Sequence, residues 1–304
     1  MTRTDRSPGS FTAALAAGVV VLDGGMSNQL EAAGYDLSDA LWSARLLADA
    51  PEAVSAAHRA YYAAGAQVAI TASYQASFEG YAKVGIGRVE AEALLRRSVE
   101  LAREAAGDGA ERWVAASVGP YGAVLADGSE YRGRYGLSVA ELERFHRPRA
   151  EVLASAGPDV LALETVPDLD EAEALLRAVD GLDVPVWLSY SVAGGRTRAG
   201  QSLEQAFRLA AGVDQVVAVG VNCCVPEEAA DAVRLAATVT GKPVVVYPNS
   251  GEGWDAGARA WAGPSTFDPE RVGEWVGAGA RLVGGCCRVG AEQIAELAGT
   301  LKQS

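Results

Sequence analysis

Apolar residues recur along the chain in eight short runs that are rich in valine, leucine, isoleucine and alanine. Most of these runs are continuous and do not alternate with polar residues, which is typical of parallel strands buried on both faces of a sheet. We therefore predict strands at Val19–Gly25, Gln67–Ser73, Trp113–Pro120, Asp159–Thr165, Pro185–Ser191, Val216–Cys223, Pro243–Asn249 and Arg281–Cys287.

Helical patterns fill the intervals between these strands. Pro51 marks a helix start, because proline is favoured in the first turn, and Gly65 ends the predicted helix. A second helix begins at Ser138, with Glu141 placed for a capping box, and Pro148 should kink it. Further helices are expected at about 88–106, 168–179, 202–212, 226–239, 268–278 and 290–302.

Eight strand–helix repeats predict a single α/β domain, a (β/α)8 or TIM barrel. A doubly wound open sheet is the alternative, but it usually has fewer strands, and no G-x-G-x-x-G motif follows a predicted strand. The first three units are longer than the later ones. Because barrel active sites form in the loops after the strands, these long loops are candidate substrate walls.

Composition and charge restrict the partners. Of the 304 residues, 49% are hydrophobic and 21% are charged, which is typical of a soluble globular protein. The formal net charge of −13 argues against nucleic acid or an anionic membrane as a partner. No apolar run is long enough to span a bilayer.

The apolar stretch Phe11–Leu22 follows two arginines and resembles a signal peptide at first sight. A small-residue cleavage pattern does not follow it, and the sequence DGG at 23–25 predicts a turn after a strand instead. We expect a cytoplasmic protein with a flexible tail at residues 1–10 and one barrel domain at residues 11–304.

Residues with reactive or polar side chains gather where the predicted strands end. In a closed barrel these ends meet at one rim, so the side chains can form one site. They are Asp23, Glu164, Asn222, Cys223, Tyr247, Asn249, Cys286 and Cys287.

The four cysteines form two adjacent pairs, at 223–224 and 286–287. A disulfide framework would spread them along the chain, whereas clustered thiols in a reducing compartment more often bind metal or react. Three thiolates, from Cys223, Cys286 and Cys287, suit zinc and leave one tetrahedral position open, as in a catalytic site. The two glycines before Cys286 permit the sharp turn that this arrangement needs.

Cysteines and histidines can also have roles other than metal binding. A buried cysteine often packs as a small hydrophobic residue, and vicinal pairs can form disulfides that act as redox switches. Neighbouring strand residues point in opposite directions, so we expect Cys224 to pack in the core while Cys223 faces the site. His58 and His146 lie on or beside apolar helical stripes, and we interpret both as structural.

An open zinc site of this kind would bind a substrate thiol and hold it as the thiolate. A free thiol with a pKa near ~8.5 is ionised to only a few per cent at neutral pH. Coordination would therefore turn a weak nucleophile into a strong one.

Seven sequence segments together resemble the homocysteine S-methyltransferase family, closest to the short bacterial and plant type that uses S-methylmethionine or S-adenosylmethionine. The resemblance runs from about residue 19 to 290, and the pairing of GVNC with GGCC is its most specific part. The segments are LDGGMSNQLE, ITASYQAS, SVGPYG, ALET, GVNC, VVYPNSGE and GGCCR.

The resemblance implies a zinc-dependent transfer of a methyl group from the sulfonium donor to the thiolate of L-homocysteine, which gives methionine. Cys223, Cys286 and Cys287 match the zinc ligands of the family, with one zinc ion per chain. No catalytic residue is expected beyond the zinc-bound substrate thiolate.

The resemblance also implies where the amino acid binds. Asp23, Gly24 and Gly25 match the segment that holds its amino and carboxylate groups. Glu164 matches the acidic residue that binds the ammonium group, and Asn222 matches the residue beside the metal.

A sulfonium donor is a cation, so aromatic faces and carboxylates should attract it. We expect the long first loops to contribute to a methyl-donor pocket. Candidate aromatic residues are Trp42, Tyr74, Tyr121 and Trp254, although each could equally pack in the core or at the rim.

Relatives with other chemistry carry additional parts. Cobalamin-dependent methionine synthases need further domains, and betaine-using relatives have a C-terminal arm. This chain ends 17 residues after Cys287, which favours a sulfonium donor and a monomer or weak oligomer.

The sequence leaves three alternatives open. A selenocysteine or selenohomocysteine methyltransferase could use the same scaffold, and a non-catalytic zinc-binding barrel would need a closed site with four protein ligands. A phosphate-binding barrel would carry a glycine-rich motif after strand seven or eight, and none is present.

Overall fold

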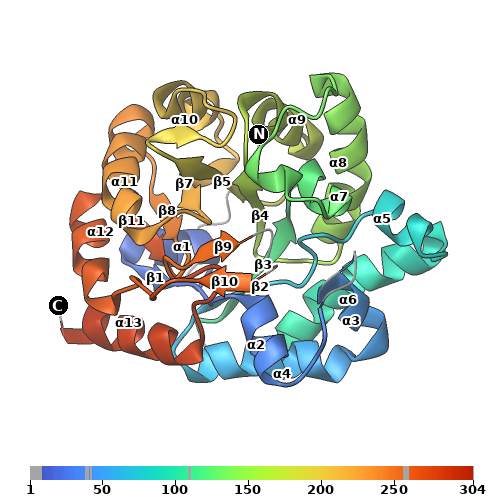
Figure 1. Ribbon diagram of the computed structural model, residues 1–304, viewed down its shortest axis with the longest axis horizontal. Helices are drawn as coiled ribbons and strands as arrows, with labels where there is room; N and C mark the ends of the chain where they lie inside the picture. Colours follow the sequence, from blue (N-terminus) through green and yellow to red (C-terminus); the bar gives the residue numbers. More distant parts are fainter. Residues whose placement is uncertain (1–8, 38–40, 42, 109–110, 256–259, 304) are drawn as a thin grey trace.

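The computed structural model describes residues 9–303 except 38–40, 42, 109–110 and 256–259. Eight parallel strands form a barrel, ordered β1-β11-β8-β7-β5-β4-β3-β2, and a parallel bridge between Leu22 and Val68 joins its ends (Figure 1). The strands are β1 (Val20–Val21), β2 (Val68–Ile70), β3 (Trp113–Val118), β4 (Val160–Val166), β5 (Val186–Ala193), β7 (Val216–Asn222), β8 (Val244–Tyr247) and β11 (Ala280–Val283). The predicted TIM barrel is confirmed.

All eight predicted strands are present, and several are shorter than predicted. β1 contains two of the seven residues predicted for it, because the chain leaves the ladder before Asp23. The residues lost from the strands form the rim loops that hold most of the candidate site residues. Two short antiparallel additions also occur: β6 (Arg196–Thr197) pairs with β5, and β9 (Gly253–Asp255) pairs with β10 (Ala260–Ala262).

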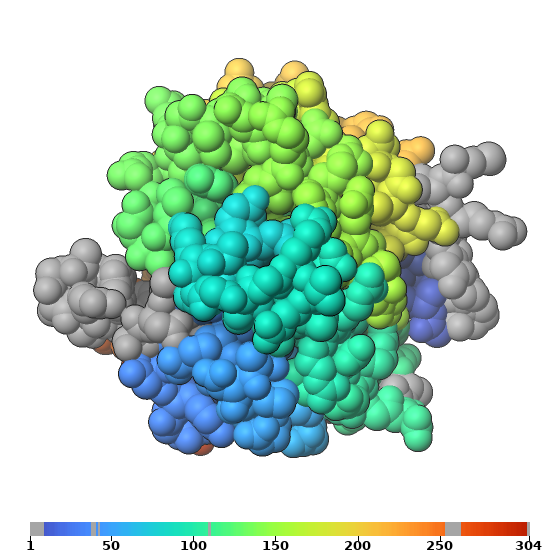
Figure 2. Space-filling model, turned by 90° about the vertical axis from the view of Figure 1, so that its right-hand side faces the viewer, coloured from blue at the N-terminus to red at the C-terminus, as the bar shows by residue number. Residues whose placement is uncertain are grey.

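Helices surround the barrel. Pro51 is the first residue of its helix, Ser138 and Glu141 form the predicted capping box, and the helix that contains Pro148 continues to Ser155. From the side, the first half of the chain, blue through green, forms a continuous outer layer (Figure 2). The outer helices are α4 (Pro51–Ala63), α6 (Arg88–Ala106), α8 (Val139–Ser155), α9 (Leu169–Val179), α10 (Leu203–Ala211), α11 (Pro226–Thr240), α12 (Val272–Ala278) and α13 (Ala291–Gln303).

Short helices occupy the long loops of the first three units, where the sequence pattern predicted none. They shape the rim of the barrel near the candidate site. They are α2 (Met26–Ala32), α3 (Ser43–Asp49), α5 (Phe78–Lys83), α7 (Tyr121–Leu125) and the 3-10 helix η1 (Ser129–Tyr131); a second 3-10 helix, η2 (Pro269–Arg271), precedes α12.

The N-terminal helix α1 (Phe11–Ala17) closes the opposite end of the barrel. The Phe11 ring lies 6.1 Å from that of Trp113, which begins β3, and 6.4 Å from that of Trp187 in β5. The apolar stretch that resembles a signal peptide thus supplies this helix and β1. In the described part of the chain, no helix combines the length and apolar character needed to cross a membrane.

Apolar side chains form two layers. One packs between the strands and the outer helices, and the other fills the barrel interior. The interior becomes polar toward the carboxyl ends of the strands: the Trp187 indole donates to the Tyr247 hydroxyl at 3.2 Å, and that hydroxyl donates to Glu164 at 2.9 Å. The packed core thus supports a polar rim above it.

Candidate metal and amino-acid site

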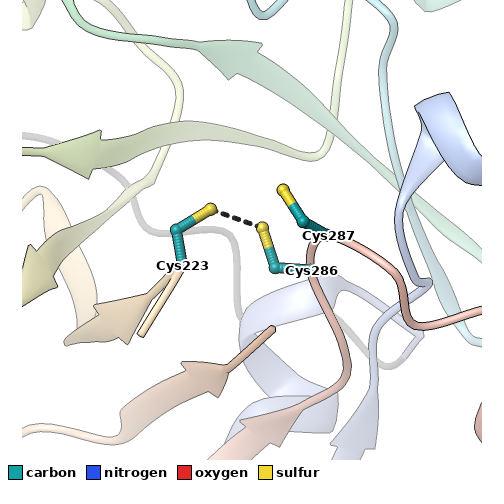
Figure 3. Close-up of side chains that lie close together, drawn as sticks. All are labelled: Cys223, Cys286 and Cys287. Carbon is teal, nitrogen blue, oxygen red and sulfur yellow. Dashed lines mark hydrogen bonds between the residues drawn. The ribbon is translucent and has the colours of Figure 1, made fainter. Parts of the chain in front are cut away.

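Three thiols converge at the rim (Figure 3). Cys223 directly follows β7, and Cys286 and Cys287 lie in the loop after β11. The Sγ atoms of Cys223 and Cys286 are 2.6 Å apart, and all three sulfurs lie within 4.8 Å of one another. Cys223 is buried and the other two are half-buried. The structure thus brings together the three cysteines singled out in the sequence.

Backbone geometry produces this convergence. Cys223 has a φ of +48°, a conformation that side-chain-bearing residues rarely adopt, and this turns the chain out of β7. The Cys286 amide donates to the Pro248 carbonyl at 2.8 Å, and the Ser250 amide donates to the Cys287 carbonyl at 2.9 Å. The segment after β8 therefore fixes the loop after β11 beside Cys223.

The two glycines before Cys286 act differently from the prediction. Neither has a positive φ, and the left-handed conformation in this loop belongs to Arg288, with a φ of +66°. A Cβ at Gly284 would lie 2.7 Å from Leu22 Cβ, and one at Gly285 would lie 2.2 Å from Val289 Cγ1. These glycines are required because neighbouring segments approach too closely for a side chain.

Cys224 turns away from the cluster. It is fully buried in the layer between strands and helices, and its carbonyl accepts from the Asn249 amide at 2.9 Å. Burial raises the pKa of its thiol to about 12, so it stays protonated. These contacts are those of a packing residue.

The three convergent thiols share charge unequally. Hydrogen bonds from Cys223 and then Cys286 hold the pKa of Cys287 well below its ordinary value. The pKa of Cys286 is raised, first by its interactions with Cys223 and Cys287 and then by burial. These opposite directions follow from the short distances between the sulfurs, because one thiolate disfavours a second beside it.

The donor set fits a soft or borderline metal ion such as zinc. Sulfurs bound ~2.3 Å from one tetrahedral zinc lie ~3.8 Å apart, so shifts of about an ångström would place all three around one ion. Thiolates select such ions over magnesium or calcium, which prefer oxygen ligands. Three protein ligands leave a position for a substrate sulfur.

A buried carboxylate lies in the loop after β1. Asp23 Oδ2 accepts from the Ile70 amide at 2.8 Å, whereas Oδ1 has no hydrogen-bond partner among the described residues. Burial raises the pKa of Asp23, and the nearby charge of Glu164 raises it further. A positively charged group would relieve both effects.

Gly24 and Gly25 bring this loop against the thiols. A Cβ at Gly24 would lie 2.3 Å from the Val289 carbonyl oxygen, and one at Gly25 would lie 2.7 Å from the Cys286 carbonyl oxygen. The Tyr61 hydroxyl donates to the Gly25 carbonyl at 2.8 Å. Side chains at these positions would therefore separate the Asp23 loop from the thiol loop.

Glu164, in β4, is also buried, and both its oxygens have partners: Ser117 donates to Oε1 and Tyr247 to Oε2. Burial raises its pKa to about 7 even though these hydrogen bonds lower it. The charge of Glu164 therefore changes near neutral pH, and a cation bound beside it would lower its pKa.

Asn222 holds Thr165, which contacts the candidate metal ligand Cys223. Its Oδ1 accepts from the Thr165 amide at 2.8 Å, and its Nδ2 donates to Thr165 Oγ1 at 2.7 Å. Thr165 has a φ of +59°, which is unusual for a β-branched residue, and its hydroxyl donates to Cys223 Sγ at 3.9 Å. Asn222 thus holds a strained threonine against a thiol.

The aromatic residues proposed for the methyl-donor pocket differ in where they lie. Tyr74 lies at the site, where it interacts with Thr165 and with the charge of Cys223. Tyr121 instead packs between Tyr135 and Phe145, with ring centroids 5.3 and 4.9 Å away. Trp42 lies outside the described residues, and for Trp254 only the backbone, in β9, is described.

The two histidines lie in the core. His146 Nε2 contacts Glu171 at 2.9 Å, and Arg149 contacts its Nδ1 at 2.8 Å. His58 has no hydrogen-bond partner among the described residues, and burial lowers its pKa to about 3. Burial lowers the pKa of both histidines, and both pack in the core, as the apolar helical stripes indicated.

Three residues near the thiols were missed in the sequence. They are Glu130 and Tyr131 in η1, and Arg198 after β6. Tyr131 interacts with the thiol of Cys287, and Arg198 donates to the Cys223 carbonyl at 3.3 Å. None of them follows a strand that the sequence predicts or lies in an apolar period, so only the folded loops bring them to the site.

The fold and the site together define a class: TIM-barrel proteins with a three-thiol metal-type site at the carboxyl rim. The sequence profile described as Homocysteine S-methyltransferase matches residues 20–301. Homocysteine S-methyltransferase 4 of Zea mays is 44% identical, over 95% of this chain and 91% of its own. The selenocysteine methyltransferase of Astragalus bisulcatus is 40% identical, over 90% of each chain.

A solved structure is similar as well. The metallated form of the homocysteine methyltransferase MmuM from Escherichia coli is 42% identical, with a TM-score of 0.83 over 93% of this chain and 96% of that one. This chain belongs to the homocysteine S-methyltransferase family and is a methyltransferase.

Proposed function

We propose that this protein transfers a methyl group from a sulfonium donor, S-methylmethionine or S-adenosylmethionine, to L-homocysteine in a zinc-dependent reaction. The observation that carries the proposal is the position of the Asp23 loop against three convergent thiols. An amino acid held by this loop would place its side-chain sulfur near the cysteines. Homocysteine, an amino acid with a terminal thiol, matches both halves of the site.

The acceptor's amino group is assigned to the two carboxylates. Asp23 Oδ1 is buried and has no partner among the described residues, and Glu164 adds a second negative charge nearby. An ammonium group between them would lower both raised pKa values and satisfy the free oxygen. Asp23 and Glu164 would orient the amino acid and would not react.

Cys223, Cys286 and Cys287 would hold zinc, which when bound supplies an acceptor thiol that is deprotonated at neutral pH. The acceptor sulfur then attacks the methyl carbon of the sulfonium in line, and the carbon–sulfur bond of the donor breaks. The bonding electrons stay with the departing thioether, which becomes neutral. Because the thiol proton has already left, no further base is required.

A second candidate is methyl transfer to selenocysteine or selenohomocysteine. The relative from Astragalus bisulcatus, which carries the name selenocysteine methyltransferase, favours it. Competition between L-homocysteine and selenocysteine at equal concentrations separates the two: the acceptor with the higher kcat/KM is the preferred one.

The test is a metal-supplemented assay. Zinc-loaded protein should form methionine from homocysteine with at least one of the two sulfonium donors, and a chelator should abolish the reaction. Readdition of zinc should restore it. Absence of product with both donors from a protein shown to contain one zinc ion per chain would contradict the proposal.

A further inference from the structure

The 3-10 helix η1 brings two residues to the thiol cluster that the proposed acceptor site does not use. The hydroxyl of Tyr131 interacts with Cys287, and the carboxylate of Glu130 interacts electrostatically with Cys287 and Tyr74. A Cβ at Gly122 would lie 2.4 Å from the Glu130 nitrogen, so this glycine lets η1 pack directly on α7. The position of η1 is therefore built into the third βα loop.

Glu130 carries a buried and incompletely satisfied carboxylate. The residue is 4% exposed, and its Oε2 has no hydrogen-bond partner among the described residues. It forms no ion pair within the described part of the chain either. A buried carboxylate oxygen without a donor is unfavourable, so this one is available to a ligand.

Arg198 lies against the ring of Tyr131, the residue that follows Glu130. Its guanidinium carbon is 5.2 Å from the centre of the Tyr131 ring, and one Nη donates to the Cys223 carbonyl. Its Nε is buried and has no hydrogen-bond partner among the described residues, nor does its guanidinium pair with a described carboxylate. A buried carboxyl group and a guanidinium group therefore lie near the thiols, and the described residues show no ion pair between them.

We propose that Glu130 binds the α-ammonium group of the methyl donor and that Arg198 binds its α-carboxylate group. This inference rests on the proposed function. An amino-acid zwitterion has a positive and a negative group, which would give Glu130 and Arg198 the oppositely charged partners that they lack. Both proposed donors, S-methylmethionine and S-adenosylmethionine, carry such a group.

The reaction requires two amino-acid subsites, because acceptor and donor both have an α-amino acid head. The loop of Asp23 belongs to the first βα unit, whereas Glu130 and Arg198 come from the third and fifth. In-line transfer places donor and acceptor on opposite sides of the methyl group. Two separate pairs of recognition groups, both near the thiols, meet this requirement.

The test compares Glu130→Gln and Arg198→Gln with the wild type in zinc-loaded protein. Each variant should lower donor kcat/KM about 10–100-fold, since a hydrogen bond to a charged group is worth about 1.5–3 kcal/mol. The KM for homocysteine and the zinc content should stay unchanged. Arg198→Lys should recover part of the loss, and the exposed-residue variants Glu151→Gln and Arg144→Gln on α8 should match the wild type.

Binding adds a readout that is independent of turnover. The Kd for S-methylmethionine, measured by calorimetry without homocysteine, should rise in both variants. A decarboxylated S-methylmethionine should bind the wild type more weakly, and Arg198→Gln should weaken it no further, because the interacting carboxylate is absent.

The outcomes separate the two proposals. Unchanged donor constants, or a loss that falls on homocysteine, would overturn the assignment of Glu130 and Arg198 while leaving the proposed function intact. A zinc-loaded wild type that forms no methionine with either sulfonium would overturn the proposed function, and this inference with it.

Discussion

At the scale of single residues, adjacent cysteines have unlike environments. Cys223 takes a left-handed conformation and faces two other thiols, whereas Cys224 packs between β7 and the outer helices. The alternation of strand residues predicts such a difference, but both cysteines lie after β7, and the left-handed turn at Cys223 sets their directions. Chemistry at this strand end therefore depends on backbone direction as well as residue type.

Substitution of a proposed ligand, Cys286, and of the core residue Cys224 should have different effects. Cys286→Ser should lose zinc and activity together, because an alcohol replaces a thiolate ligand. Cys224→Ala should keep one zinc ion per chain and lower the free energy of unfolding by about 1 kcal/mol, the cost of a small cavity. Elemental analysis and urea denaturation measure the two quantities. A Cys286→Ser protein with full zinc and full activity would show that the ligand assignment is wrong.

At the scale of elements, α8 links the rim loops through a buried polar network. Arg149 donates to the carbonyls of Ala76 and Gly119, which lie in the loops after β2 and β3. His146 connects Arg149 to Glu171 on α9, and Glu171 also accepts from the Tyr121 amide. The network fixes the loops that carry Tyr74 and η1 without contacting the thiols.

Glu171 gives this network a pH dependence. Burial raises its pKa to about 7 from an ordinary value of 4.5, although Tyr121, Tyr135 and Arg149 lower it. The folded state therefore binds the proton more tightly, so the stabilisation is full below pH ~4.5 and is lost as the pH rises to ~7. Its size is at most about 3 kcal/mol.

Glu171→Gln should lack this dependence. The wild-type free energy of unfolding should fall relative to that of the variant between pH 5 and pH 8. Urea unfolding at several pH values measures the difference, with the exposed Asp170→Asn on the same helix as the control. Parallel pH profiles for wild type and Glu171→Gln would contradict the assignment.

At the scale of the whole molecule, the barrel and the thiol positions follow from the sequence, but much of the rim does not. Continuous apolar runs identify all eight strands because burial on both faces of the sheet excludes polar residues. Their ends place Asp23, Glu164 and the cysteines at one rim. The barrel fold can therefore be predicted without information on the loops.

The remaining features depend on tertiary contacts that leave no local pattern. η1 has three residues, and Glu130 is buried because α7 and the thiol loop lie beside it. Tyr121 follows a strand just as the true rim residues do, yet its ring packs outward against Phe145. The glycines before Cys286 were interpreted as turn formers, whereas they relieve crowding from Leu22, just after β1, and from Val289, just after the thiols. Such contacts appear only when distant segments meet.

The most direct test of the central claim is X-ray absorption at the zinc edge, recorded before and after addition of L-homocysteine. We expect three sulfurs at ~2.3 Å and one lighter ligand in the zinc-loaded protein, and four sulfurs once homocysteine is bound. The added sulfur would be the acceptor that receives the methyl group. A site with four protein ligands, or a spectrum unchanged by homocysteine, would contradict the account.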